Sequence, residues 1–150
     1  MLRSESDHAI NKYRHRFFRD KSSLFELSHA EIPYLRKIYK ANGSIMMNEI
    51  VGESVYHKSH ATRAINRLVK DGFVIKEKNP KDLRGFVLST TEKGKDIAIK
   101  TGKIVKEWDD LVETVITNEE REVLQNITKK ILHLLKEYYN EEDIVNEANI

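Results

Sequence analysis

Polar and cationic side chains recur at helical spacing between residues 58 and 67. Arginine can grip guanine through two hydrogen bonds, and asparagine can do the same with adenine, so this pattern could read base edges in a major groove. Apolar residues fall on the opposite side of the same segment, at Ala61, Ala64, Ile65 and Leu68. We therefore expect a helix that buries one face and presents donors and acceptors on the other, namely Ser59, Thr62, Arg63, Asn66 and Arg67.

These side chains also have an ordinary structural interpretation. Arg63 and Arg67 could form surface ion pairs, and His57 and His60 could simply be polar residues at a helix start. Residues 57–84 contain eight cations and three anions, a net charge of +5, whereas the rest of the chain carries −3. A basic middle of this kind is typical of a surface that binds a polyanion, but a solvated helix face would have the same composition.

The elements around this segment favour the first interpretation. A short helix is expected over residues 46–53 and a longer one over 57–71, which Gly72 would end. Two strands, 73–78 and 85–89, flank a basic turn and predict a β-hairpin. This order is that of a helix-turn-helix followed by a wing. The wing could reach a minor groove, and three of its lysines could contact phosphates: Lys76, Lys78 and Lys81.

Amphipathic helices are predicted on both sides of this middle. One covers residues 6–20, and another follows a capping box, Ser28-x-x-Glu31, although Pro33 indicates a kink or a later start. A long helix over 91–116 should bury Ile97, Ile104, Val105, Trp108, Leu111 and Val115. A last helix begins with a second capping box at Thr117 and carries an apolar stripe: Val123, Leu124, Ile127, Ile131, Leu134, Leu135 and Tyr138.

The predicted fold is therefore mainly α with a small β-hairpin wing. We expect a single domain, 1–150, in which 28–90 form a winged helix-turn-helix core and 1–27 and 91–150 form dimerisation helices. A small winged domain cannot cover the stripes of such long helices, and contiguous exposed apolar surface marks an interface. Closed twofold dimers are the commonest solution, and a homodimer predicts half-sites about 10 bp apart.

Several classes of protein and site are not expected. The chain has no cysteine, which excludes disulfides, thiolate zinc sites and thiol redox switches. Neither a signal peptide nor a membrane-spanning run is expected, which favours a cytoplasmic protein with no membrane partner. No cofactor is expected. No metal site is expected either, because four of the histidines are dispersed in the sequence without metal-binding spacing: His8, His15, His29 and His133.

Two functions other than nucleic-acid binding are alternatives for this chain. An enzyme is not expected, because the sequence has no nucleophile–base pair, no glycine-rich phosphate loop and no carboxylate pair of evident purpose. A winged helix used only for protein–protein contact would need no basic recognition face. Such a protein would bind DNA weakly and without strong salt dependence.

Residues 57–74 resemble the recognition helix of the MarR (multiple antibiotic resistance regulator) family. Asp82-x-Arg84, followed by Thr91-x-x-Gly94, is similar to the wing pattern of that family at the same spacing. Two positions depart from the pattern. Thr90 stands where leucine is frequent, and Met46 stands where a serine or threonine often caps the short helix, a role that Ser44 could take.

The resemblance implies a ligand-responsive repressor that binds a near-palindromic operator in double-stranded DNA as a triangular homodimer. It would place Lys58, Ser59, His60, Thr62, Arg63 and Arg67 at the major groove, and Arg84 in the minor groove, held by Asp82. Together with Asn66, Lys78 and Lys81 these are the predicted DNA-binding residues. The resemblance also implies a pocket for a small aromatic or phenolic effector, for which Tyr13, Arg16, Phe17, Tyr34 and Trp108 are candidate linings, unless these side chains form dimer core.

Overall fold

A computed structural model describes residues 5–23, 25–54 and 57–140. The chain divides into two compact units, Met1–Asp109 and Asp110–Ile150. The elements of the first unit are α1 (Glu5–Ser22), α2 (Ile32–Lys40), β1 (Ile45–Met46), α3 (Met47–Gly52), α4 (Lys58–Lys70), β2 (Val74–Lys78), β3 (Phe86–Thr90) and most of α5 (Glu92–Glu113). The second unit contains the end of α5 and the whole of α6 (Asn118–Tyr139).

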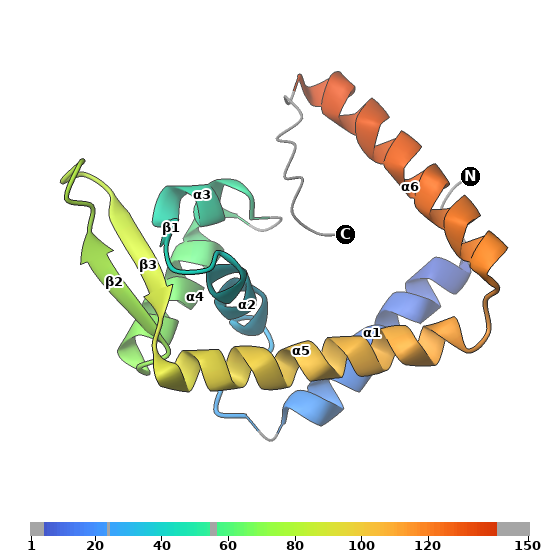
Figure 1. Ribbon diagram of the computed structural model, residues 1–150, viewed down its shortest axis with the longest axis horizontal. Helices are drawn as coiled ribbons and strands as arrows, with labels where there is room; N and C mark the ends of the chain where they lie inside the picture. Colours follow the sequence, from blue (N-terminus) through green and yellow to red (C-terminus); the bar gives the residue numbers. More distant parts are fainter. Residues whose placement is uncertain (1–4, 24, 55–56, 141–150) are drawn as a thin grey trace. The chain divides into compact units, whose positions relative to one another are not determined.

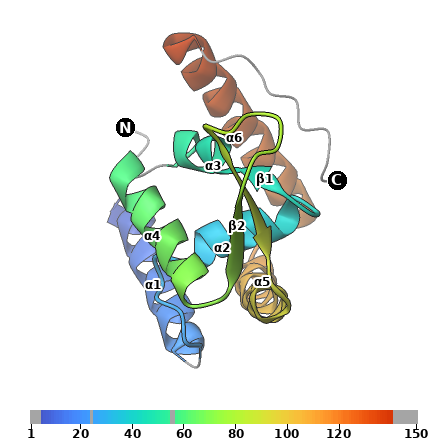
Figure 2. The same cartoon turned by 90° about the vertical axis from the view of Figure 1, so that its left-hand side faces the viewer.

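The predicted hairpin is confirmed, and it belongs to a three-stranded antiparallel sheet in the order β1-β3-β2. Its register pairs Val74 with Thr90 and Lys78 with Phe86. The third strand, β1, was not predicted, because two residues are too few to show an alternating pattern. Both views place α4 and the hairpin at the N-terminal end of α5 (Figure 1 and Figure 2).

The core lies between α2, α3, α4 and the sheet. All four residues predicted to face inward from α4 are buried, with Ala61, Ile65 and Leu68 fully enclosed. Leu35 and Ile38 from α2 and Phe73 and Leu88 beside the hairpin complete this core. Each large apolar side chain buried in this way contributes about 1.5–3 kcal/mol, so the apolar face of α4 is held firmly inward and its polar face is left outside.

The start of α5 is joined to the end of α4 by a small hydrogen-bond cluster. The Thr91 hydroxyl donates to the Gly72 carbonyl oxygen (2.7 Å) and accepts from the Gly94 N–H (3.0 Å). The Thr91 N–H donates to the Phe73 carbonyl oxygen (3.1 Å). Gly72 has a φ of +79°, which favours glycine at this helix end. The Thr91-x-x-Gly94 pattern therefore has a structural basis in joining the wing to α5.

Three expectations about helix starts have different outcomes. As Pro33 indicated, α2 starts late, at Ile32, and only half of the expected capping box forms: the Ser28 N–H donates to the Glu31 carboxylate (3.0 Å). The second capping box, between Thr117 and Glu120, is complete. The suggested Ser44 cap is wrong, because Met46 is the N-cap of α3 and makes no side-chain cap bond.

The apolar residues of the long helices differ in exposure. Ile104 of α5 is buried, as predicted, but Leu111 and Val115 are 53% and 80% exposed, so the expectation that these two are enclosed within the chain is wrong. In the second unit, no residue of α6 is buried, and its whole predicted stripe is exposed. Within the described ranges, none of the helices has the length and apolar run needed to cross a membrane.

Candidate nucleic-acid interface

The polar face of α4 is accessible along its length. Lys58, Ser59, Arg63, Asn66 and Arg67 are exposed, and the two remaining predicted residues of this helix, His60 and Thr62, are half-buried. The helix begins one residue after His57, whose Nδ1 accepts the Ser59 N–H (3.3 Å) as a cap. His57 is therefore a helix-start residue, as one of the two earlier interpretations held.

Two side chains on this face are tied to neighbouring elements. The Arg67 Nε lies 3.4 Å from an oxygen of Glu31, a buried carboxylate in the turn before α2. The Asn66 Oδ1 accepts from the Lys76 Nζ of β2 (3.2 Å). Arg67 thus forms the ion pair that was the alternative to DNA contact, but 68% of its side chain remains exposed, so the two roles are compatible.

Two further contacts orient polar groups of α4. The Arg63 Nε donates to the Ser59 carbonyl oxygen one turn earlier (3.2 Å). The His60 Nδ1 lies 3.2 Å from the hydroxyl of buried Tyr34 on α2. These bonds reduce the conformational freedom of the two side chains, which lowers the entropy that an ordered contact with a partner would cost.

The wing tip is closed by short-range hydrogen bonds, two from side-chain oxygens and one between backbone groups. Asp82 Oδ1 accepts the Arg84 N–H (3.0 Å), and the Asp82 carbonyl oxygen accepts the Gly85 N–H (3.0 Å). Asn79 Oδ1 accepts the Lys81 N–H (3.0 Å). Asp82 therefore holds the Arg84 backbone, and the side chains of Arg84, Lys81 and Lys78 remain exposed.

Lys76 differs from the other wing lysines. Besides its bond to Asn66, its Nζ lies 4.4 Å from the centroid of the Phe86 ring, a cation–π contact. The residue is half-buried. These contacts link β2 to both α4 and β3, and they make Lys76 primarily a structural residue of the wing.

A second candidate site is a cavity of about 320 Å³ between α1, α2 and α5. Trp108 lines it, but the structure does not bring the other four predicted lining residues to its wall. Tyr34 instead is buried beside α4, where its hydroxyl meets Ser54 Oγ (2.9 Å) and His60. Tyr13 is 61% exposed, and Phe17 packs edge-on against Trp108 at 5.4 Å between centroids.

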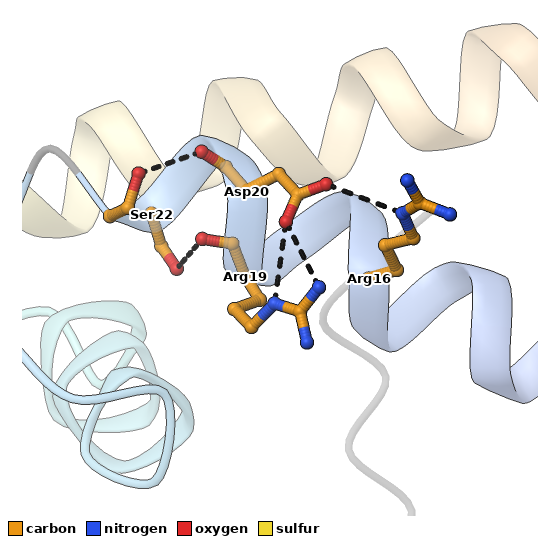
Figure 3. A network of polar contacts seen from close by, with 5 residues as sticks. Arg16, Arg19, Asp20 and Ser22 are labelled. Carbon is orange, nitrogen blue, oxygen red and sulfur yellow. Dashed lines mark hydrogen bonds and ion pairs between the residues drawn. The ribbon is translucent and has the colours of Figure 1, made fainter.

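Arg16 does not line that cavity either. Its Nε lies 3.6 Å from Asp20, which also accepts two hydrogen bonds from Arg19 (Figure 3). The resemblance to the MarR family, rather than a pattern in the residues, implied a pocket that this arginine could line. Helical spacing gives the face of a helix, but it does not show which face the rest of the fold covers.

The cavity contains polar residues that the sequence did not identify. Its wall combines apolar side chains, including Phe18 and Ile104, with a charged and ionisable set: Arg14, His15, His29, Arg36 and Asp109. Burial lowers the pKa of Arg36, and the nearby Asp109 carboxylate partly offsets that change. Two cations and an apolar wall suit an amphipathic anion.

His15 and His29 lie together at this wall, although they are far apart in the sequence. His15 Nδ1 is 3.3 Å from His29 Nε2, and the rings meet edge-on at 73°. His29 keeps contact with solvent, but desolvation at the cavity lowers its pKa, and the neighbouring His15 lowers it further. These two histidines are 14 residues apart in the sequence, and the packing of separate segments brings them together. Among the residues that the structure describes, no three metal-binding side chains gather.

Comparison with known proteins gives one consistent result. A model of the MarR family matches residues 27–86. The chain is 32% identical over 114 residues to the HTH-type transcriptional regulator BilQ of Clostridioides difficile, covering 75% of this chain and 73% of that protein. It is 27% identical over 134 residues to the uncharacterised HTH-type transcriptional regulator YwhA of Bacillus subtilis, covering 83% and 91%.

Solved structures agree with this result. A crystal structure of a mutant MarR from E. coli complexed with operator DNA matches with a TM-score of 0.71 and 25% identity, over 83% of this chain and 89% of that chain. A MarR-type regulator from Listeria monocytogenes complexed with a 26mer DNA matches with a TM-score of 0.81 and 20% identity over the full length of both chains. The chain belongs to the MarR family of winged helix-turn-helix transcriptional regulators.

Proposed function

We propose that this chain is a sequence-specific regulator that binds a near-palindromic operator in double-stranded DNA as a homodimer in the cytoplasm. Helix α4 enters the major groove, where Ser59, Arg63 and Asn66 reach base edges. Arg84 at the wing tip enters the adjacent minor groove, and nearby cations contact phosphates. The proposed DNA-binding residues are Lys58, Ser59, His60, Thr62, Arg63, Asn66, Arg67, Lys78, Lys81, Asp82 and Arg84.

The main support for this proposal is the packing of α4: its apolar face is buried in the core, while its opposite, polar face stays accessible. A recognition helix needs this arrangement, because base readout requires donors and acceptors whose direction does not change on binding. The closed wing tip supports the same conclusion for Arg84, since Asp82 fixes the backbone from which the guanidinium projects. The DNA-bound relatives support the choice of double-stranded DNA as the partner.

Homodimerisation is supported by the apolar side chains that the single chain leaves exposed. Leu111 near the end of α5 and Val115 in the turn after it are exposed, and α6 carries a continuous stripe that includes Ile127, Ile131 and Leu135. An amphipathic helix with this pattern is stable in water when its stripe is covered. A second copy of the same chain would cover the α6 stripe. The twofold symmetry of such a dimer would match a near-palindromic DNA site.

The cavity between α1, α2 and α5 is the proposed effector site. Arg14 and Arg36 would face the carboxylate or phenolate of a small aromatic anion, and Trp108 and Phe18 would pack on its ring. Binding there would reduce affinity for the operator. Such a protein would act as a repressor, because it would leave the DNA when the effector accumulates.

A binding experiment tests this function directly. The protein is titrated into fluorescein-labelled duplexes, one from beside its own gene and one of shuffled sequence, over a series of salt concentrations. We expect the native fragment to bind at least about 10³-fold more tightly than the shuffled duplex, with an affinity that falls steeply as salt rises. Weak, equal and salt-insensitive binding would favour a winged helix that contacts only protein.

A further inference from the structure

Glu31 is a buried carboxylate at the edge of the proposed DNA-binding face. Only 4% of the residue is exposed, and among residues 5–23, 25–54 and 57–140 no lysine or arginine is buried. Its Oε2 accepts the Ser28 N–H at 3.0 Å, and its Oε1 lies 3.4 Å from the Nε of Arg67 on α4. Burial of a charge is unfavourable unless it is paired and hydrogen-bonded. These two partners therefore hold the carboxylate in place, and the carboxylate in turn orients the Nε of the Arg67 guanidinium.

The turn that carries Glu31 is closed on itself. The Glu31 N–H donates to the Ser28 carbonyl oxygen (3.0 Å), while the Ser28 N–H donates to the Glu31 side chain. Two reciprocal hydrogen bonds span only four residues, so a displacement of one residue of the turn displaces the others. The turn is thus a small rigid unit between α1 and α2.

The same turn also forms part of the cavity wall. His29 lines the cavity, and its Nε2 lies 3.3 Å from His15 Nδ1 on α1. Its neighbours around the cavity are Arg14, Arg36 and Asp109. One four-residue turn therefore contacts the cavity through His29 and the proposed recognition helix through Glu31.

We propose that Glu31 is a positioning residue for Arg67, and that the Ser28–Glu31 turn makes the position of Arg67 depend on what occupies the cavity. This inference rests on the proposed function. An anion bound beside His29 draws its imidazole away from His15, moves the turn and withdraws the Glu31 carboxylate from Arg67. Coupling between two sites is reciprocal in binding free energy, so DNA on α4 must also alter the cavity.

Trp108 makes the reciprocal effect measurable without a known effector. It is the only tryptophan of the chain, and it lines the same cavity as His29. Unlabelled duplex from beside the gene is titrated into the protein while Trp108 emission is followed, and a parallel anisotropy titration with labelled duplex records binding itself. We expect Trp108 emission to change in the wild-type protein with the same midpoint as the anisotropy curve.

The variant Glu31→Gln removes the charge of the turn, and Glu26→Gln is its matched control. Glu26 lies in the same connection between α1 and α2 and pairs with Lys93 (3.0 Å) rather than with α4. We expect Glu31→Gln to bind the duplex but to lose the Trp108 response, and Glu26→Gln to keep both. If Glu31→Gln does not fold, Arg67→Gln removes the same ion pair by changing its exposed partner. Its Trp108 titration is carried out at lower salt, where DNA binding still reaches saturation.

The outcomes separate this inference from the proposed function. Absence of DNA binding by the wild-type protein would overturn the proposed function itself. Binding by the wild-type protein with an unchanged Trp108 signal would overturn only the coupling. A response that survives in Glu31→Gln, or that is lost equally in Glu26→Gln, would show that the Glu31–Arg67 contact does not carry it.

Discussion

Gly94, in the first turn of α5, lies against the backbone of Phe73, so that a Cβ atom at position 94 would overlap the Phe73 carbonyl oxygen. The Phe73 carbonyl carbon would lie 3.0 Å from that Cβ and a Leu35 methyl group 3.4 Å from it. The close approach allows the Thr91 hydroxyl to bond both Gly72 and Gly94. The wing and α5 therefore meet at a point where only glycine fits.

This contact predicts that Gly94→Ala destabilises the fold. Backbone cannot move aside as a flexible side chain can, so we expect a loss of about 1–3 kcal/mol in the free energy of unfolding, measured by urea denaturation followed by circular dichroism. Gly102→Ala is the control on the same helix, since nothing lies within 4 Å of its added Cβ. It should be neutral or slightly stabilising, and equal losses in both variants would refute the packing explanation.

The environment of His29 predicts a pH dependence of stability. Its folded-state pKa lies below the ordinary value of 6.5, so near and below that pH the unfolded chain binds the proton more readily than the folded chain. The stability that this difference contributes is present above about pH 6.5, falls as the pH falls through that value, and levels off below the lowered folded pKa.

Melting temperatures measured between about pH 5 and pH 8 check this expectation. His29→Gln should flatten the curve in that window, because the variant has no proton to bind at this position. His8→Gln, at an exposed position of α1, is the control and should keep the wild-type slope. A slope identical in all three proteins would remove His29 as its source.

Arg63 is expected to contribute sequence discrimination. Arg63→Ala should cost about 1–3 kcal/mol on the native fragment and relax discrimination at the base pair it reads, as measured by anisotropy on a set of single-base variants. Lys70→Ala, an exposed cation in the last turn of the same helix, is the control and should leave discrimination unchanged. Equal weakening by Arg63→Ala on native and shuffled duplexes would contradict a base contact.

Lys81 is expected to contact a phosphate. Lys81→Ala should reduce the slope of log affinity against log salt by about one unit, because one fewer counterion is released, and it should weaken binding similarly on all sequences. Lys103→Ala, exposed on α5, provides a control outside the wing. An unchanged slope for Lys81→Ala would place this residue outside the interface.

The stripe of α6 is expected to be dimer interface. Ile131→Glu puts a charge into that stripe and should shift the mass measured by light scattering from dimer toward monomer, since burial of an unpaired carboxylate is unfavourable. Lys129→Glu lies two residues away, on the other side of the helix, and makes the larger change in charge. It should leave the dimer intact, and a monomeric wild-type protein would refute the assignment of the stripe.

The sequence alone predicted the elements that depend on local patterns. The inward face of α4 follows from apolar residues at three- and four-residue steps, and the hairpin follows from two strand-forming runs around Asn79-Pro80. Pro33 correctly indicated the late start of α2, because proline is tolerated only in a first helical turn. The exposed positions of Ser59, Arg63, Asn66 and Arg67 on α4 follow from the same periodicity, since residues opposite a buried stripe face solvent.

Only the tertiary structure decided which distant side chains meet. Nothing in the local sequence relates His15 to His29, or Glu31 to Arg67, because these pairs are formed by the packing of separate elements. For the same reason four of the five candidate cavity residues implied by the resemblance do not line the cavity: Tyr34, for example, is buried beside α4, where its hydroxyl meets His60. Helical spacing within one segment predicts which residues share a face of that helix. A cavity is formed by side chains from several segments, so its lining depends on how those segments pack together.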